Sequence, residues 1–380
     1  MLTKTINSLK NNLLSIPGWK TNRKIIVIES DDWGTERSPT KNIIDHISNI
    51  YNIELNPYIK YDSLENEDDL TALFESLKSI KNKEGRNPIF TANCIVANPN
   101  FDKIKSSNYT EYHYELVTDT FSKYSNRQKC FNIWNNGMTE NLFKPQFHGR
   151  EHINVSLWLN QLQSGDKLIH ALFENRFWGI VKKGESNFVT KNSMAGCNYS
   201  STAELAFIKN SLLEGLAIFE SIIGYKSKSF IANNYIWDEN IEKILLEKAV
   251  FYIQGQSFQL YPEFTRKITT KNGKRHFTGQ TNKSKQIYLT RNCFFEPCTD
   301  NYFSENLALC LDQIEKAFRW KNPAIISTHR VNFIGSIDEK NRTENLEKLK
   351  LLLSTVVKKY PDVEFMTSDQ LGELIKNTNK

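Results

Sequence analysis

A buried strand that ends in two adjacent carboxylates is the feature that most constrains this chain. Residues 25 to 28 read I-I-V-I, four branched apolar side chains in succession, and Asp31 and Asp32 follow shortly after. A strand with this pattern is buried on both faces, as in the centre of a parallel sheet. Because adjacent carboxylates repel each other, such a pair at a strand end indicates a bound cation or a proton-transfer site. A solvated turn is the alternative explanation.

The length and composition are those of an enzyme-sized α/β protein. The chain has 380 residues, of which 39% are hydrophobic, and this is enough for one large domain with a substantial core. Its formal charge of +6 comes from 49 basic and 43 acidic residues, which are spread along the chain without a polybasic block. We therefore expect no nucleic-acid partner.

The cysteines and the apolar segments bear on the compartment of the protein. Six cysteines fall at irregular spacings, and Cys293 and Cys298 lack a second pair that would complete a metal site. We therefore expect free thiols. No apolar run is long enough for a signal sequence or a membrane span. We expect a cytoplasmic protein without integral membrane association.

Strand and helix patterns alternate along most of the sequence, which predicts a parallel sheet in a single domain, residues 1–380. Strands are expected at 25–28, 88–93, 176–181, 229–232, 249–253, 323–329 and 363–366, and helices at 38–51, 70–77, 154–163, 201–223 and 341–359. Residues 1–23 contain a short amphipathic pattern and are expected to form a helical cover. Segments 94–141 and 181–204 are expected to be insertions or long loops. The acidic run 65–69 is interpreted as the solvated start of a helix.

A pair of histidines four residues apart forms the second candidate piece of a site. His148 and His152 lie in the segment F-H-G-R-E-H, just after a strand-like stretch. If this segment is helical, both imidazoles lie on one face, a spacing that metal sites use. Together with a carboxylate they would form a suitable ligand set for a divalent transition metal. A chance pair on a helix surface is the alternative.

A third candidate residue, His329, ends the predicted strand 323–329. This strand repeats the logic of the first, since a branched apolar run terminates in a titratable side chain. His329 would lie on the same edge of the sheet as Asp31 and Asp32, where a proton donor is useful. A core histidine with satisfied hydrogen bonds is the alternative.

These pieces, in this order, resemble the polysaccharide deacetylases of the NodB-homology type, a carbohydrate esterase 4-like family. The matching motifs are S-D-D-W-G at 30–34, H-G-R-E-H at 148–152 and S-T-H at 327–329. The resemblance extends over most of the chain, from about residue 25 to 372, and is specific in the first two motifs. It implies a distorted (β/α)7 barrel with helical and loop insertions.

The same resemblance implies roles for individual residues. Asp32, His148 and His152 would hold a divalent metal, with zinc expected and cobalt or nickel as alternatives. Asp31 would be the general base, and His329 would be the general acid.

The third motif departs from the family pattern. Where the family has an Arg-x-Pro segment whose arginine orients the base, this chain has Ile231-Ala232-Asn233. Arg150 or Arg330 is the hypothetical replacement. The family stabilises an oxyanion through a backbone N–H of this motif, and by position the donor would be that of Asn234. No match to the family's aspartate-rich fourth motif is found near Gln254 and Gln256.

The function implied is a metal-dependent hydrolase that removes an N-acetyl or related acyl group from a sugar or a sugar-containing precursor. The expected partner is an acetylated saccharide or a saccharide-linked small molecule. Trp33, Trp178, Tyr235 and Trp237 are candidates for stacking on sugar faces, with core packing as the alternative. Two other functions are considered: a catalytically impaired metal- or sugar-binding protein, motivated by the missing arginine, and a hydrolase of a non-sugar amide.

Overall fold

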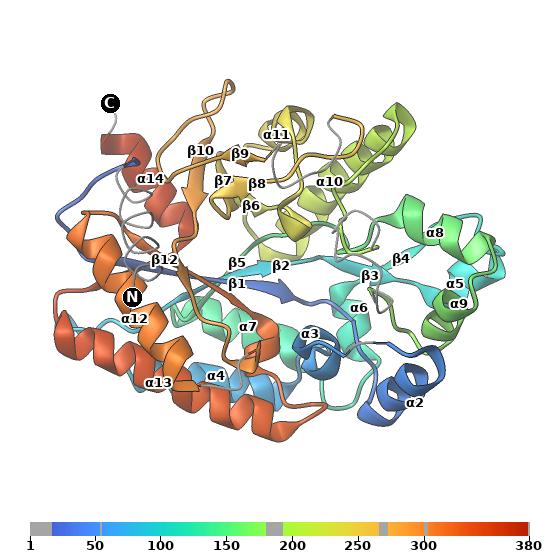
Figure 1. The fold of residues 1–380 in the computed structure, drawn as a ribbon, viewed down its shortest axis with the longest axis horizontal. Helices are drawn as coiled ribbons and strands as arrows, with labels where there is room; N and C mark the ends of the chain where they lie inside the picture. Colours follow the sequence, from blue (N-terminus) through green and yellow to red (C-terminus); the bar gives the residue numbers. More distant parts are fainter. Residues whose placement is uncertain (1–16, 54, 180–192, 266–272, 300–302, 379–380) are drawn as a thin grey trace, which may run out of the picture.

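The computed structural model describes residues 17–53, 55–179, 193–265, 273–299 and 303–378 (Figure 1). Its centre is a sheet of parallel strands. The strands are β1 (Ile25–Trp33), β2 (Phe90–Cys94), β5 (Phe143–Phe147), β6 (Ser229–Ile231), β7 (Tyr252–Gly255), β10 (Ile287–Thr290), β11 (Cys293–Phe294), β12 (Ala324–His329) and β13 (Glu364–Met366). The predicted α/β class with a parallel sheet is confirmed.

The strands are arranged as a distorted barrel. Their order is β10-β7-β6-β5-β2-β1-β12-β11, with β13 paired to the start of β1. The two ends of this order, β10 and β11, belong to one stretch of chain, because residues 291 and 292 alone separate them. That stretch pairs with β7 on one side and with β12 on the other. If β10 and β11 are counted as one strand, they close a ring of seven strands. The ring is interrupted at Arg291, which lies between β10 and β11 and outside both strands.

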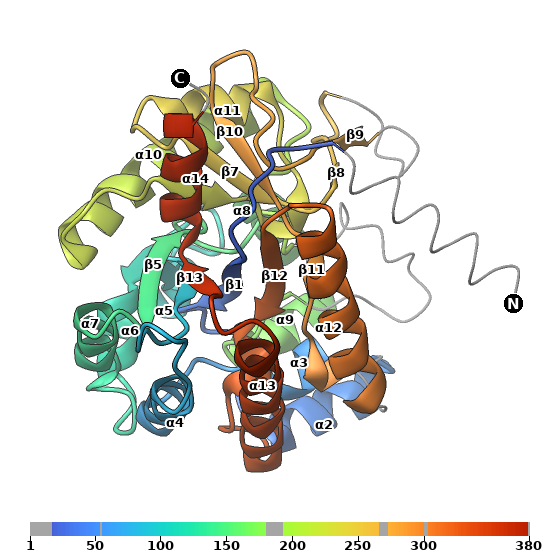
Figure 2. The same cartoon turned by 90° about the vertical axis from the view of Figure 1, so that its left-hand side faces the viewer.

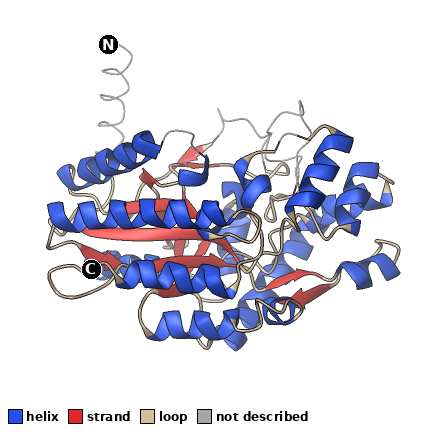
Figure 3. Ribbon diagram, turned by 90° about the horizontal axis from the view of Figure 1, so that it is seen from below, coloured by secondary structure: helices blue, strands red, loops and turns tan. Residues whose placement is uncertain are grey.

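Helices cover the outside of this ring, as Figures 2 and 3 show. They are α4 (Glu67–Lys78), α7 (Cys130–Thr139), α10 (Thr202–Ile223), α11 (Glu239–Leu246), α12 (Phe303–Arg319) and α13 (Glu339–Lys359). The outward side chains of β1, Ile26 and Ile28, are buried in the core that these helices form with the strands. Burial on this face accounts for every second residue of the continuous apolar run, and burial on the inward face accounts for the others.

The inward side chains of β1 fill the barrel in layers. Ile25 and Val27 pack against α14 (Ser368–Thr378), which closes the amino-terminal end of the barrel. Glu29 comes next along the strand and accepts a hydrogen bond of 2.7 Å from the Ser368 hydroxyl. Since strand residues alternate between faces, Asp31, two residues after Glu29, also points inward. It lies further along β1, at the carboxyl-terminal end of the barrel and opposite to α14. The site is therefore at the edge where parallel α/β folds bind ligands.

A second, mostly helical unit flanks the barrel. It is built from α2 (Lys41–Tyr51), α5 (Phe101–Ser106), α8 (Val155–Gln163) and α9 (Lys167–Glu174). Aromatic side chains join these helices, with the Phe101 ring 5.9 Å from that of Trp158 and 5.1 Å from that of Phe173. The short helix α3 (Pro57–Tyr61) leads from this unit back to the barrel.

Segment 94–141, expected as an insertion or long loop, contains regular structure that its weak periodicity did not reveal. Its elements are β3 (Ala97–Pro99), β4 (Tyr114–Leu116), α5, α6 (Val117–Ser122) and α7. β3 and β4 form a small antiparallel pair. A second antiparallel pair, β8 (Phe258–Gln259) with β9 (Lys274–Arg275), lies in the stretch of sequence between β7 and β10. In the described part of the chain, short 3-10 helices lie at Asn233–Tyr235, Pro297–Thr299 and Arg330–Phe333.

Two local predictions are wrong. Residues 176–179 do not form the expected strand, and the rest of that stretch lies outside the described residues. The acidic run 65–69 does precede a helix, and Asn66 and Asp69 form a capping box there. It is not solvated throughout, however, because Glu65 and Asp69 are buried and bind Arg330 and Arg342.

The expected helical cover falls largely in residues 1–16, and segment 181–204 falls partly in 180–192. Both of these ranges lie outside the described part of the chain. All six cysteines are free, as predicted. Within the described residues, no helix has both the length and the apolar character needed to cross a membrane.

Candidate metal centre

A cavity of about 280 Å³ lies at the carboxyl-terminal ends of β1, β5, β6 and β12. It contains most of the residues that the sequence singled out. The lining residues are Asp31, Asp32, Arg37, Asn56, Tyr58, His148, His152, Met194, Ala232, Asn234, Tyr235, Gln256 and His329.

Three buried side chains converge on one point of this cavity. Asp32 Oδ1 lies 3.4 Å from His148 Nε2 and 3.1 Å from His152 Nε2. Asp32 has a φ of +76°, an uncommon value for a non-glycine residue, which turns the end of β1 toward the histidines. Among the described residues, this is the one group of three histidine, cysteine or acidic side chains whose ligand atoms all lie within 4.8 Å of one another.

The two histidines do not share a helix, so the helical arrangement that was considered for their spacing is not the one present. His148 comes directly after β5, and the chain to His152 is irregular. Gly149, with a φ of +127°, makes the turn between them, a conformation that side-chain-bearing residues rarely adopt. The imidazoles nevertheless lie side by side in an edge-to-face arrangement, with ring centroids 5.0 Å apart. The four-residue spacing thus brings the two imidazoles together through a tight turn at Gly149 and not through a helix.

The protonation pattern of the three groups fits a cation. His148 Nδ1 lies 2.9 Å from the Ile231 carbonyl oxygen, which can only accept, so Nδ1 carries a hydrogen and Nε2 is the ring nitrogen that faces Asp32. Burial lowers the pKa of His152, so its imidazole is neutral at pH 7. Burial alone raises the pKa of Asp32, but Arg37 and the imidazoles outweigh it and hold that pKa well below its usual range. Two ring nitrogens and a carboxylate are a suitable donor set for a divalent transition metal.

Asp31 has a partner that the sequence did not suggest. Arg291 donates from Nη1 to Asp31 Oδ2 at 2.7 Å and from Nη2 to Oδ1 at 2.6 Å. Its Nε donates to Glu29 Oε2 at 2.7 Å, and all three side chains are buried. Burial raises the pKa of Asp31, but Arg291 more than offsets it and lowers that pKa to about 2. Asp31 is therefore ionised at neutral pH.

His329 is held by a second carboxylate that the sequence did not suggest. Its Nδ1 lies 2.5 Å from Glu296 Oε1, and its Nε2 lies 3.6 Å from Asp31 Oδ2. Asn332 fixes the other oxygen of Glu296 with a hydrogen bond of 2.7 Å. Burial lowers the pKa of His329, but the two carboxylates overcome this and raise it well above the usual value. His329 is therefore an imidazolium at neutral pH.

Neither arginine proposed to replace the missing one contacts Asp31. Arg150 pairs with Glu151 at 2.6 Å and with Glu214 at 2.5 Å, outside the cavity. Arg330 is fully buried and pairs with Asp62 at 2.9 Å and Glu65 at 2.7 Å. The prediction that either one orients the base is wrong in its geometry, because Arg291 occupies that position.

Arg291 could have been found by the rule that located the other residues. Residues 287–290 read I-Y-L-T, an apolar run that ends directly before a charged side chain. Glu296 carries no such signal, since it lies in irregular chain between β11 and the following 3-10 helix.

The remaining predicted site residues divide between cavity and core. Asn234 lines the cavity with a φ of +55°, and Tyr235 beside it also lines the cavity. Trp33, Trp178 and Trp237 are each at most 2% exposed and do not line the cavity, so they cannot stack on a ligand there. Core packing explains these three tryptophans.

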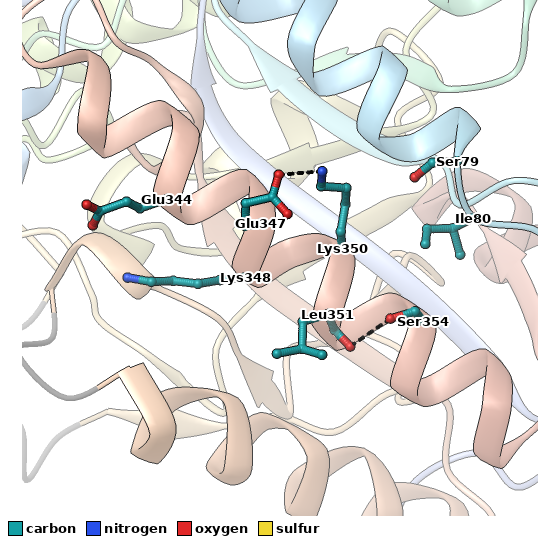
Figure 4. A pocket seen from close by; sticks show the side chains of 8 residues that line it. All are labelled: Ser79, Ile80, Glu344, Glu347, Lys348, Lys350, Leu351 and Ser354. Atoms are coloured by element: carbon teal, nitrogen blue, oxygen red, sulfur yellow. Dashed lines mark hydrogen bonds and ion pairs between the residues drawn. The ribbon is translucent and has the colours of Figure 1, made fainter.

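A larger hollow of about 690 Å³ lies elsewhere, between the end of α4 and the outer face of α13 (Figure 4). Its charged side chains come from α13, where Lys350 pairs with Glu347 at 2.5 Å. It holds neither histidine nor cysteine, and it is remote from the carboxyl ends of the strands. The smaller cavity is therefore the candidate site.

Neither a protein-family model nor a curated protein matches this sequence. Solved structures that resemble the chain over most of its length include polysaccharide deacetylases, at very low sequence identity. One, a protein described as a polysaccharide deacetylase from Mycobacterium smegmatis, is 9% identical with a TM-score of 0.46, and the match covers 96% of this chain and 94% of that one.

Two further similar structures have comparable scores. A protein described as a polysaccharide deacetylase from Pseudomonas aeruginosa PAO1 is 7% identical with a TM-score of 0.46, over 93% of this chain and 91% of that one. The Puue allantoinase is 9% identical with a TM-score of 0.47, over 95% of this chain and 93% of that one.

The fold and the site together define a class: an α/β barrel protein with a buried Asp-His-His set that could hold a divalent metal. An ionised carboxylate and a protonated imidazole lie beside that set. We take the function from these side chains.

Proposed function

We propose that this protein is a metal-dependent hydrolase that removes an N-acetyl or related acyl group from a sugar or a sugar-containing precursor. One observation carries the proposal. Asp31 and His329, of opposite charge and 3.6 Å apart, border the same cavity as the three candidate metal ligands. Amide hydrolysis needs a proton acceptor for the attacking water and a proton donor for the leaving amine.

Asp32, His148 and His152 would hold the metal, with zinc preferred for this donor set and cobalt or nickel as alternatives. When bound, such an ion polarises an acyl carbonyl and increases the acidity of water. These three groups are preorganised for that task, because the His148 tautomer is fixed by the Ile231 carbonyl and Asp32 is oriented by Arg37.

The chain's own residues would move the protons. Asp31, kept ionised by Arg291, accepts a proton from the attacking water. His329, kept protonated by Glu296, donates a proton to the departing amine. The backbone N–H of Asn234 is the proposed donor to the oxyanion, which is supported by the position of Asn234, a residue of the cavity lining with a φ of +55°.

The cavity supports a small or terminal saccharide. Its volume of about 280 Å³ is near the lower end of ligand pockets, so it suits about one sugar ring better than a section of polymer. Tyr58 and Tyr235 line it and offer aromatic faces for such a ring.

The binding-only alternative loses the observation that motivated it. It rested on a missing arginine beside the base, and Arg291 occupies that place. Acetate release from acetylated amino acids rather than from acetylated sugars would instead indicate hydrolysis of a non-sugar amide.

The test combines metal analysis with acyl release. We expect about one divalent ion per wild-type chain after loading, and loss of that ion in an Asp32→Ala, His148→Ala double variant. Released acetate is then measured on a panel of acetylated sugars and acetylated amino acids. The Asp31→Asn variant is the matched control, expected to retain the metal and lose turnover. Absence of metal from the wild type after incubation with zinc, cobalt and nickel would refute the proposal.

A further inference from the structure

Arg37 is a buried cation on the wall of the candidate site, and the mechanism above uses only one end of it, the end that orients Asp32. Its side chain is 6% exposed, it lines the cavity, and it lies over the ring of Trp178 at 5.4 Å. One end of its guanidinium is committed: Nη1 donates to Asp32 Oδ2 at 3.3 Å and to Asp62 Oδ2 at 3.0 Å.

The other edge of the same guanidinium lacks an oxygen acceptor. Nε is buried and has no hydrogen-bond partner. Nη2 contacts the Met194 sulfur at 3.6 Å, and a thioether is a weak acceptor. Buried donors are nearly always paired with an acceptor, so an edge with two poorly satisfied N–H groups calls for an explanation.

The shape of this edge selects a particular acceptor. Nε–H and the adjacent Nη2–H point in parallel, which matches the two oxygens of a carboxylate or phosphate. Asp32 and Asp62 cannot serve this edge, since Asp32 faces the two histidines and Asp62 also binds Arg330 at 2.9 Å.

Met194 lines the same cavity as Arg37, and its sulfur is the atom that contacts this edge. A methionine side chain is unbranched and has three rotatable bonds, so it changes conformation more readily than other core side chains. A ligand oxygen that displaced the sulfur would replace a weak acceptor by a charged one.

We propose that Arg37 binds an anionic oxygen group of the substrate through Nε and Nη2, with Met194 moving aside. The substrate class is then an acidic N-acyl saccharide, one that carries a carboxylate or a phosphate. This inference rests on the proposed function for the saccharide, but the anion site can be measured without turnover.

Calorimetric titration of the metal-loaded protein tests the proposal with four probes. N-acetylglucosamine is the neutral sugar, N-acetylglucosamine 6-phosphate and N-acetylmuramic acid carry the two kinds of anion, and inorganic phosphate tests the site without a sugar. The proteins are the wild type, Arg37→Gln, Arg37→Lys and, as a matched control, Arg176→Gln. Arg176 is a partly buried arginine outside the cavity, and metal content is checked for each variant.

We expect the wild type to bind at least one anionic sugar about tenfold or more tightly than the neutral sugar, as for a bidentate charge-assisted pair. Arg37→Gln should abolish this preference, Arg37→Lys should restore part of it, and Arg176→Gln should retain it. The preferred anionic sugar distinguishes a carboxylate from a phosphate.

Equal affinity of the wild type for neutral and anionic sugars would overturn the proposal, and this comparison needs no variant. A preference that survives Arg37→Gln would also overturn it. If no sugar binds and no acetate is released, the proposed function fails, and inorganic phosphate decides the inference. Phosphate binding that is lost in Arg37→Gln supports the anion site, whereas phosphate binding independent of Arg37, or none, overturns it.

Discussion

Arg291 holds both carboxylate oxygens of Asp31, at 2.7 and 2.6 Å, although 260 residues separate the two in the chain. The pair is buried, and Glu29 binds the remaining Nε of the same guanidinium. The contact is possible because the chain leaves the sheet between β10 and β11, so that Arg291 points into the barrel. The residue at the break between β10 and β11 thus also keeps the candidate base ionised.

Arg291→Gln should therefore lower stability and raise the pKa of Asp31 from about 2. Removing one partner from a buried ion pair costs about 3–5 kcal/mol, because the other charges are left uncompensated. Denaturant unfolding at neutral pH measures this loss. Arg23→Gln is the control, since Arg23 pairs with Glu364 at the surface and exposed pairs contribute about 0–1 kcal/mol. Equal losses in the two variants would contradict the role assigned to Arg291.

Glu296→Gln should move the alkaline limb of the pH–activity profile to lower pH. Glu296 keeps the pKa of His329 above its usual value, so its removal lets the imidazole lose its proton at a lower pH. The pH dependence of acetate release measures the shift. An alkaline limb that does not move would show that His329 is not the proton donor.

The same pair predicts a pH dependence of stability. The folded pKa of His329 is raised above the unfolded value of about 6.5, so the pair stabilises the fold fully below that pH. This contribution is lost as pH rises through the folded pKa. Unfolding free energies of wild type and Glu296→Gln should thus differ most below about pH 6.5 and converge at alkaline pH. A difference that is constant with pH would contradict this.

The sequence predicted the residues that lie at the ends of long or strongly apolar strands. Asp31, Asp32 and His329 follow the apolar runs of β1 and β12. These runs can be read from a few neighbouring residues, and they show that both strands are buried. The parallel sheet brings these ends together, and His148 joins them from the end of β5. Period and burial were enough to find Asp31, Asp32 and His329, whereas His148 was found from its four-residue spacing to His152.

The contacts that the sequence did not predict depend on tertiary structure. Arg291 reaches Asp31 only because β10 and β11 close the barrel, and Glu296 lies in irregular chain. Trp33, Trp178 and Trp237 were candidates for sugar contacts. Trp33 lies beyond a register shift at the end of β1, and Trp178 and Trp237 lie in irregular chain, so the local sequence carries no signal for the direction of these side chains. Only the folded structure separates the tryptophans in the core from Tyr235 on the cavity wall.

Removal of the metal should destabilise the wild type but not a variant without the ligands. A ligand that binds only the folded state adds about 4 kcal/mol when its free concentration is a thousand times its Kd. We therefore expect a chelator to lower the melting temperature of the zinc-loaded wild type and to leave His152→Ala unchanged. A chelator effect of the same size in both proteins would place the metal at another site.

Gly149→Ala tests whether the turn between the two histidines sets the metal site. A Cβ at this position would lie 2.8 Å from the Glu151 carbonyl oxygen, with φ at +127°, so the backbone between His148 and His152 must shift. Gly85→Ala is the matched control, because Gly85 also has a positive φ, +78°, but no atom lies within 4 Å of its added Cβ.

Both variants should lose about 1–2 kcal/mol for an alanine in a left-handed conformation, and Gly149→Ala should lose more. Disturbed ligand orientation should also weaken zinc binding in Gly149→Ala by on the order of 10–100-fold, as seen when supporting groups around a metal are changed. Competition with a chromophoric chelator measures the affinity. If Gly149→Ala binds zinc as tightly as Gly85→Ala, the turn does not position the ligands, and His148 and His152 must be fixed by their contacts with Ile231 and Trp178 instead.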